Sequence, residues 1–215
     1  DMSQRVMDSI KIMTPNVEVY SIDEAFISIN QTDRTNIIRQ AQNMRSNIYQ
    51  WTGIPTSLGI APTKVLSKVA NSMAKKESST GVFDLRDKGV QEDILKALDI
   101  KDIWGISHRL GSRLCSMGLK NGLDFRNAEP SLIRKSFGVV VERIVYELRG
   151  ISCLGLEDTR PKKNIMSSKS FGVSLQNIQD IRCRDIVILT MEQEIMQEIY
   201  QKILKNQKKK IRKKT

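Results

Sequence analysis

The chain has 215 residues, with 35 Lys or Arg against 24 Asp or Glu, which gives a formal net charge of +11. Hydrophobic residues make up 40%, and no apolar run approaches the ~20 residues of a membrane-spanning helix, so the composition excludes a disordered chain and a membrane span. Three widely spaced cysteines and a single histidine also exclude a disulfide framework and a zinc centre built from Cys or His.

The first 88 residues have a pattern of alternating helices and strands. Apolar residues at helical spacing predict helices over 3–13, over 35–51 and from Pro62-Thr63 to the turn residues 78–81. Short β-prone runs predict strands over 17–20, 25–29, 56–60 and 82–83. The β-β-α-β-α-β order after the first helix predicts an α+β fold in which helices pack on one face of a sheet.

The remainder of the chain is predicted to be mostly helical from residue 89 to about 150, with a strand over 166–171 and a long helix over 180–204. Residues 96–163 carry 13 basic and 8 acidic side chains interspersed with apolar positions, a pattern that suits contact with a nucleic-acid backbone. The last fourteen residues hold eight basic and no acidic side chains, which predicts a solvated tail.

Two adjacent acids, Asp23 and Glu24, lie between two apolar strands. Adjacent residues on a strand point to opposite faces, so both side chains can converge on one point only at a turn or a bulge. Carboxylates in an apolar hairpin are costly to bury without a cation, and Mg²⁺ is a common partner. The residues alone leave two interpretations open, an exposed pair of turn acids and a divalent-metal site.

The segment from Tyr20 to Phe26 resembles the second carboxylate motif of Y-family translesion DNA polymerases. Further segments, in the same order as in that family and in its UmuC branch in particular, are similar over 59–64, 68–71, 74–76, 103–110 and 134–150. The similarity extends from about residue 2 to 204. It implies part of a palm over 1–88, a helical thumb with a helix-hairpin-helix over 89–155, a linker over 156–164, the start of a little finger over 165–204 and a basic tail over 205–215.

The same resemblance implies error-prone translesion DNA synthesis in the SOS response to DNA damage, by template-directed nucleotidyl transfer with two Mg²⁺ ions. Asp23 would bridge both ions, and Glu24 would bind the ion that activates the primer 3′-hydroxyl. Ser21 is predicted to be a nearby polar group and not a nucleophile, because no His or Cys base accompanies it in the sequence.

Lys64, Lys68 and Lys75 are spaced by four and seven residues on one predicted helix, which places them on the same side. The spacing by itself also fits a solvated basic face. The resemblance implies that Lys75 binds the triphosphate, and we extend this prediction to Lys64 and Lys68 because a lysine ammonium suits phosphate oxygens.

A glycine-flanked helix in the middle of the chain is predicted to grip DNA. Gly105-Ile106-Ser107 opens this helix and Gly118 closes it, which resembles a helix-hairpin-helix, with Ser107 at the place of the usual second glycine. An ordinary glycine-capped helix is the alternative interpretation. The predicted DNA-binding residues are Gly105, Ile106, Ser107, Arg109, Arg113 and Gly118, with further backbone contacts expected from Lys120, Arg134, Lys135 and Arg143.

The resemblance also places a first metal-binding Asp, the fingers and an aromatic sugar gate in a segment that this sequence does not contain. We therefore expect that the chain alone does not extend a primer, and a non-catalytic DNA-binding module is the alternative function. The implied partners are primer-template DNA, dNTP, a UmuD-type dimer, a recombinase filament and the sliding clamp, in the bacterial cytoplasm at the nucleoid.

Overall fold

The structure is a computed structural model that describes residues 2–29, 34–76 and 78–156. Contacts divide the chain into two units, Asp1–Asp158 and Thr159–Thr215, and every described residue lies in the first. The strand predicted over 166–171, the helix predicted over 180–204, the little finger, most of the linker and the basic tail lie outside the described residues. No helix in the described part of the chain is long and apolar enough to cross a membrane.

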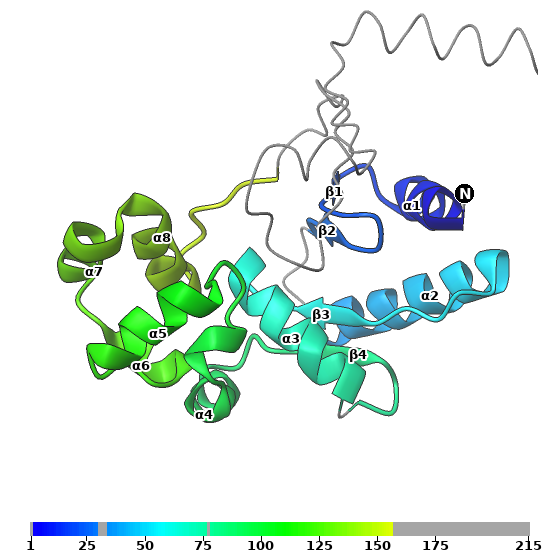
Figure 1. Cartoon of the computed structure of the whole chain (residues 1–215). Helices are drawn as coiled ribbons and strands as arrows, with labels where there is room; N and C mark the ends of the chain where they lie inside the picture. Colours follow the sequence, from blue (N-terminus) through cyan, green and yellow to red (C-terminus); the bar gives the residue numbers. More distant parts are fainter. Residues whose placement is uncertain (1, 30–33, 77, 157–215) are drawn as a thin grey trace, which may run out of the picture. The chain divides into compact units, whose positions relative to one another are not determined.

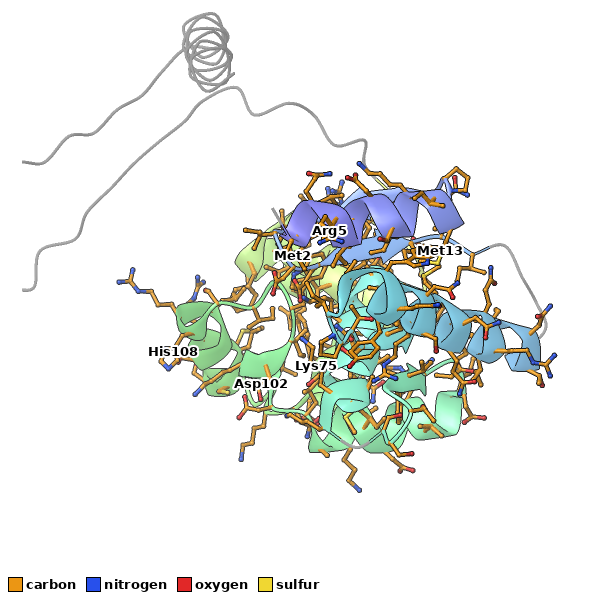
Figure 2. All side chains as sticks on the ribbon, turned by 90° about the vertical axis from the view of Figure 1, so that its right-hand side faces the viewer. Met2, Arg5, Met13, Lys75, Asp102 and His108 are labelled. Atoms are coloured by element: carbon orange, nitrogen blue, oxygen red, sulfur yellow. The ribbon has the colours of Figure 1, made fainter. Side chains whose placement is uncertain are left out.

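The first part of the chain follows the predicted order of elements. These are α1 (Met2–Met13), β1 (Val17–Val19), β2 (Ala25–Ile27), α2 (Arg34–Thr52), β3 (Leu58–Ile60), α3 (Lys64–Lys76) and β4 (Val82–Asp84). Figure 2 shows α1, between the labelled Met2 and Met13, lying over α2, with which it is in contact. The prediction of an α+β fold is confirmed.

Within the described residues the four strands form two separate two-stranded sheets and not one. Strands β1 and β2 are antiparallel, with Glu18 opposite Phe26, as expected for a hairpin. Strands β3 and β4 are parallel, with Leu58 opposite Val82, and α3 provides the crossover that a parallel pair requires.

Helices pack on both faces of β3, so the prediction of a single covered face is wrong. Leu58 contacts an apolar cluster formed by α1, α2 and the β1–β2 hairpin. Its neighbour Gly59 faces α3, because a Cβ atom placed there would lie 2.2 Å from the backbone nitrogen of Asn71. Successive residues of a strand point to opposite faces, so the absent side chain of Gly59 is what lets α3 cover the second face.

The second part of the described chain is helical, as predicted. It contains α4 (Lys88–Ala97), the 3₁₀ turn η1 (Ile100–Asp102), α5 (His108–Ser116), α6 (Gly122–Asn127), α7 (Pro130–Phe137) and α8 (Val139–Leu148). In Figure 1 these helices cluster together, and α3 lies between them and β3. One apolar core joins Val65 and Leu66 of α3 to Leu114, Phe125 and Leu148. The burial of this shared apolar surface holds α3 and the helical part together.

A buried carboxylate completes this junction. Glu147 of α8 is fully buried, and it accepts hydrogen bonds from the backbone N–H groups of Val65, Cys153 and Leu154 at 3.3, 2.6 and 3.0 Å. Val65 lies in the first turn of α3, where backbone N–H groups have no partner within the helix. The hydroxyl of Thr63 also donates to the carbonyl of Glu147, at 2.8 Å. Glu147 therefore connects α8, the start of α3 and the segment that follows α8.

Candidate active site

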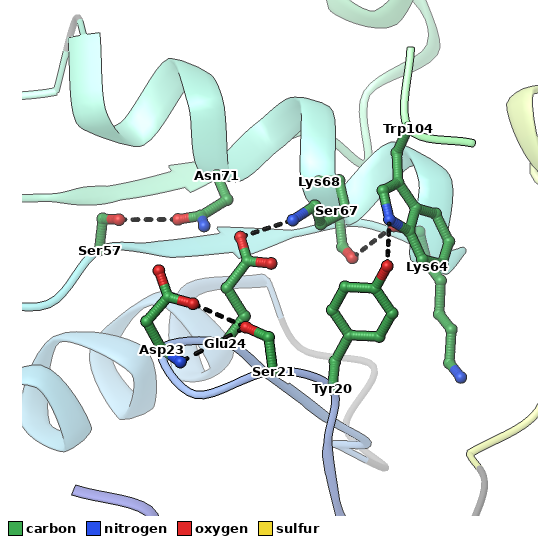
Figure 3. A network of polar contacts seen from close by, with 10 residues as sticks. All are labelled: Tyr20, Ser21, Asp23, Glu24, Ser57, Lys64, Ser67, Lys68, Asn71 and Trp104. Carbon is green, nitrogen blue, oxygen red and sulfur yellow. Dashed lines mark hydrogen bonds and ion pairs between the residues drawn. The ribbon is translucent and has the colours of Figure 1, made fainter. Parts of the chain in front are cut away.

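The two predicted acids lie on the tight connection between β1 and β2. The backbone N–H groups of Tyr20 and Ser21 both donate to the carbonyl of Glu24, at 3.0 and 3.1 Å, and close the turn. The hydroxyl of Ser3 in α1 donates to the carbonyl of Ile22 within the same turn. Figure 3 shows the side chains of Asp23 and Glu24 both pointing toward β3 and α3. A turn is the geometry in which two adjacent acids can face one way, as the sequence predicts.

Asp23 is exposed, and its surroundings lower its pKa. The hydroxyl of Ser21 donates to Asp23 Oδ1 at 2.6 Å, and this hydrogen bond is the largest cause that lowers the pKa of Asp23. The charges of Lys75 and Lys68 lower that pKa further, although partial desolvation opposes the shift. Ser21 therefore orients the carboxylate and lowers its pKa, in agreement with its predicted role as a polar neighbour.

The three lysines of α3 have different partners. Lys64 Nζ lies 2.5 Å from Glu18 Oε2, and both side chains are nearly buried, with 11% and 12% of their surface exposed. Lys68 Nζ lies 2.5 Å from Glu24 Oε1. Lys75 is exposed near the end of α3, and no ion pair of Lys75 occurs within the described residues. A triphosphate can therefore reach Lys75 without the loss of an ion pair to any described carboxylate.

A cavity of about 970 Å³ brings these side chains together. Asp23 and Glu24 line it from the hairpin, and Lys68, Asn71 and Lys75 line it from α3. Ser57 donates a hydrogen bond to the side-chain oxygen of Asn71 at 2.8 Å across one wall (Figure 3). Residues of β2, β3, α1 and α2 line much of the remaining wall, so the cavity extends between the two small sheets.

An aromatic cluster that sequence reasoning did not anticipate joins the hairpin to the helical part. Tyr20 and Phe26 pack edge-on at a centroid distance of 5.6 Å, and Trp104 lies 5.4 Å from Tyr20 and 5.6 Å from Phe26. The indole N–H of Trp104 donates to the hydroxyl of Tyr20 at 3.1 Å. Lys64 lies 5.1 Å from the Phe26 centroid. No local pattern indicates this contact, because Tyr20 and Trp104 are 84 residues apart.

The donors at the turn suit a hard divalent cation but are few. Carboxylate oxygens are the ligands that Mg²⁺ prefers, and the lowered pKa of Asp23 keeps this carboxylate ionised to lower pH than usual. Within the described residues no group of three or more His, Cys, Asp or Glu could hold a metal ion. Asp23 and Glu24 therefore fit part of a Mg²⁺ coordination shell, to which water or further ligands must contribute.

The predicted DNA-binding residues lie around the start and end of α5. Gly105 has φ +90°, and Ser107 caps α5 by accepting a hydrogen bond from the N–H of Leu110 at 3.3 Å. Ile106 is only 7% exposed and belongs to the core, so in any interface it is limited to its backbone. The exposed members of the predicted set are Gly105, Ser107, Arg109, Arg113 and Gly118.

Two predicted basic residues make contacts within the protein. Arg113 lies over the ring of Phe137 at 4.7 Å and donates to the carbonyl of Ser136 at 3.3 Å. Arg134, 64% exposed at its side chain, pairs with Glu142 at 3.3 Å. Lys120, Lys135 and Arg143 are exposed, and so is His108, the single histidine of the sequence, at the start of α5 (Figure 2).

The sequence is similar to that of several bacterial proteins. Residues 1–72 match the family model described as IMS, the impB/mucB/samB family. The protein UmuC of Salmonella typhimurium is 40% identical over 189 residues, which cover 85% of this chain and 44% of that protein. MucB of Escherichia coli is 36% identical over 184 residues, 84% of this chain and 44% of that protein. DNA polymerase IV of Treponema denticola is 26% identical over 210 residues, 95% of this chain and 51% of that protein.

The comparison with solved structures also finds proteins of similar fold. DinB from Sulfolobus solfataricus is 27% identical with a TM-score of 0.55, over 68% of this chain and 43% of that chain. A Y-family DNA polymerase chimera with Dbh segments is 25% identical with a TM-score of 0.63, over 76% of this chain and 47% of that chain.

These comparisons confirm the class that the motifs predict, because the chain carries the sequence features and the fold of Y-family DNA polymerases. Within this class, the chain is 36–40% identical to UmuC, MucB, SamB and ImpB, as the predicted resemblance to the UmuC branch implies. The chain spans less than half the length of these UmuC-branch relatives, between 42% and 44%.

Proposed function

We propose that this chain provides the acidic turn and the DNA grip of a UmuC-type translesion DNA polymerase. The observation that carries the proposal is the cavity in which Asp23 and Glu24 face Lys68 and Lys75 of α3. Adjacent acids opposite a row of lysines can bind a divalent cation and a triphosphate together, which template-directed nucleotidyl transfer requires.

Each residue has a distinct proposed role. Asp23 and Glu24 would hold two Mg²⁺ ions, which, when bound, lower the pKa of an attacking hydroxyl and neutralise charge on the triphosphate. Ser21 orients Asp23 through its 2.6 Å hydrogen bond and lowers the pKa of this carboxyl. Lys75 binds the triphosphate as a point charge. Lys68 and Lys64 contribute to the same phosphate site only after leaving Glu24 and Glu18, their present partners.

We assign the palm to residues 1–88 and the thumb to residues 89–155, with the helix-hairpin-helix formed around Gly105, Ser107 and Gly118. Exposed Arg and Lys side chains around α5 would contact the phosphate backbone and carry no base specificity. In the same proposal the chain acts on damaged DNA in the SOS response. It would work with a UmuD-type dimer, a recombinase filament and the sliding clamp, at the nucleoid of a bacterial cell.

Primer extension tests the catalytic part of the proposal. The chain alone should not extend a primer with Mg²⁺ and dNTP, because its described residues supply only two clustered carboxylates. A chimera with the amino-terminal part of Salmonella UmuC joined ahead of this chain should extend a primer across a lesion. Asp23→Ala should abolish this extension, because it removes the proposed shared ligand of both ions. Equal activity in the Asp23→Ala chimera would refute the assignment of the metal ligands.

A non-catalytic DNA-binding module is the second candidate, and it is favoured by the absence of a three-ligand group among the described residues. In both candidates the thumb binds duplex DNA, so binding should weaken steeply with salt and be nearly independent of sequence. Removal of residues 205–215 should leave this binding in place. A truncated chain that no longer binds duplex would show that the basic tail, and not the thumb, is the DNA-binding element.

A further inference from the structure

Glu24 already has a cation of the protein's own. Lys68 Nζ lies 2.5 Å from Glu24 Oε1, and the two side chains are only 23% and 28% exposed. This pair is better shielded from water than an ordinary surface ion pair, so the ammonium is held more firmly at the carboxylate. Lys64, one turn earlier on α3, pairs with Glu18 and not with the acids of the turn. Within the part of the chain that the structure describes, Lys68 is thus the lysine that forms an ion pair with the acidic turn.

Lys68 also contacts the aromatic cluster. Its ammonium lies 5.7 Å from the ring centroid of Tyr20, within the range of a cation–π interaction. The hydroxyl of Tyr20 in turn accepts the hydrogen bond from Trp104, at 3.1 Å. Figure 3 shows Glu24, Lys68, Tyr20 and Trp104 in sequence along one side of the site. Any movement of the ammonium therefore changes the electrostatic environment of the contact between the hairpin and the helical part.

We propose that Lys68 is a positioning residue that competes with the divalent cation for Glu24, and that its displacement alters the Tyr20–Trp104 contact. The inference rests on the proposed function, since the cation is the one assigned to Asp23 and Glu24. A divalent ion binds carboxylate oxygens at about 2.0–2.6 Å, and at that distance it repels an ammonium held by the same carboxylate. Lys68 consequently neutralises Glu24 without metal and moves away from it when metal binds.

Mn²⁺ binding to the full chain tests this competition. A Trp51→Phe background leaves Trp104 as the only tryptophan, because the sequence contains two. Free Mn²⁺ is measured by electron paramagnetic resonance in about 0.15 M salt, where the Debye length is about 8 Å and general charge effects are small. Lys68→Met should bind Mn²⁺ about three- to tenfold more tightly than the background protein, which corresponds to the release of one partly shielded ion pair.

Two control variants and one fluorescence measurement distinguish competition at Glu24 from a general loss of positive charge. Lys76→Met removes an exposed charge from the same helix and should leave the Mn²⁺ dissociation constant within about twofold of the background. Lys68→Arg keeps the competing charge and should not tighten binding. In the background protein, Mg²⁺ should change the emission of Trp104, whereas in Lys68→Met the change should be lost because no ammonium is displaced.

The outcomes distinguish this inference from the proposed function. If Asp23→Asn abolishes Mn²⁺ binding but Lys68→Met binds no more tightly than Lys76→Met, the competition is refuted and the metal site stands. If Asp23→Asn binds Mn²⁺ as tightly as the background, the metal site fails and the inference fails with it. Circular dichroism checks the fold of each variant, and Lys68→Gln replaces Lys68→Met if the methionine variant does not fold.

Discussion

Removal of the Glu147 carboxylate should destabilise the fold more than any surface change, because this side chain satisfies three backbone donors at once. Glu147→Ala leaves the N–H groups of Val65, Cys153 and Leu154 without their acceptor. An orphaned buried donor costs about 1–3 kcal/mol. Cys153 and Leu154 are only half-buried and water can reach them, so the lower part of that range applies to both. The expected loss is about 3–5 kcal/mol of unfolding free energy.

Glu147→Gln provides an isosteric comparison. Cys153 and Leu154 both donate to Oε1, whereas Val65 donates to Oε2. An amide can keep its oxygen on the first pair, but its NH₂ group then faces the N–H of Val65 and one hydrogen bond is lost. The expected cost is about 1–2 kcal/mol, well below that of the alanine variant.

Urea unfolding followed by far-UV circular dichroism measures both effects as shifts of the transition midpoint. Glu92→Gln is the matched control, because Glu92 is 57% exposed and its pair with Arg126 at 3.4 Å should contribute less than about 1 kcal/mol. A loss below about 1 kcal/mol for Glu147→Ala would refute the reasoning. Equal losses for the glutamine and alanine variants would show that the charge, and not the number of accepted bonds, stabilises the junction.

Three further changes test other parts of the structure. Ser21→Ala should raise the pKa of Asp23 toward its ordinary value, which carboxyl ¹³C NMR during a pH titration would detect as a midpoint at higher pH. Because that pKa is lowered in the folded protein, the stabilisation from Asp23 is present above the ordinary carboxyl pKa and is lost as the pH falls through the lower folded value. Gly59→Ala should lower the unfolding free energy, measured by urea unfolding, by at least about 3 kcal/mol, because its Cβ would lie 2.2–2.6 Å from backbone atoms of α3. An unchanged unfolding free energy would contradict the packing of helices on both faces of β3. Gly105→Ala should lower the unfolding free energy by about 1–2 kcal/mol, because φ is +90° and the new Cβ would lie 2.9 Å from Ile144 Cδ1. An unchanged unfolding free energy would exclude this strain.

Local patterns in the sequence were sufficient for the elements and for the acidic turn. Helical spacing of apolar residues predicted α1, α2 and α3, and the β-prone runs on either side of Asp23 and Glu24 predicted a hairpin with both acids at its turn. These features depend on residues within a few positions of one another, so backbone geometry and side-chain periodicity decide them without the rest of the chain. The spacing of Lys64, Lys68 and Lys75 likewise predicted that they lie on one side of α3, and the structure adds that all three line one cavity.

The partners of these side chains were decided by the tertiary structure. Lys68 meets Glu24 across 44 residues, Val65 meets Glu147 across 82, and Trp104 meets Tyr20 across 84. Such pairs form only when the shared core brings α3, the hairpin and the helical part together, and no local pattern specifies which long-range contacts that packing selects. The sequence by itself therefore determined which chemical groups this protein offers and on which elements they lie. The tertiary structure decided that Lys68 pairs with Glu24, because tertiary packing, and not the spacing of residues in the sequence, sets the distance between these two side chains.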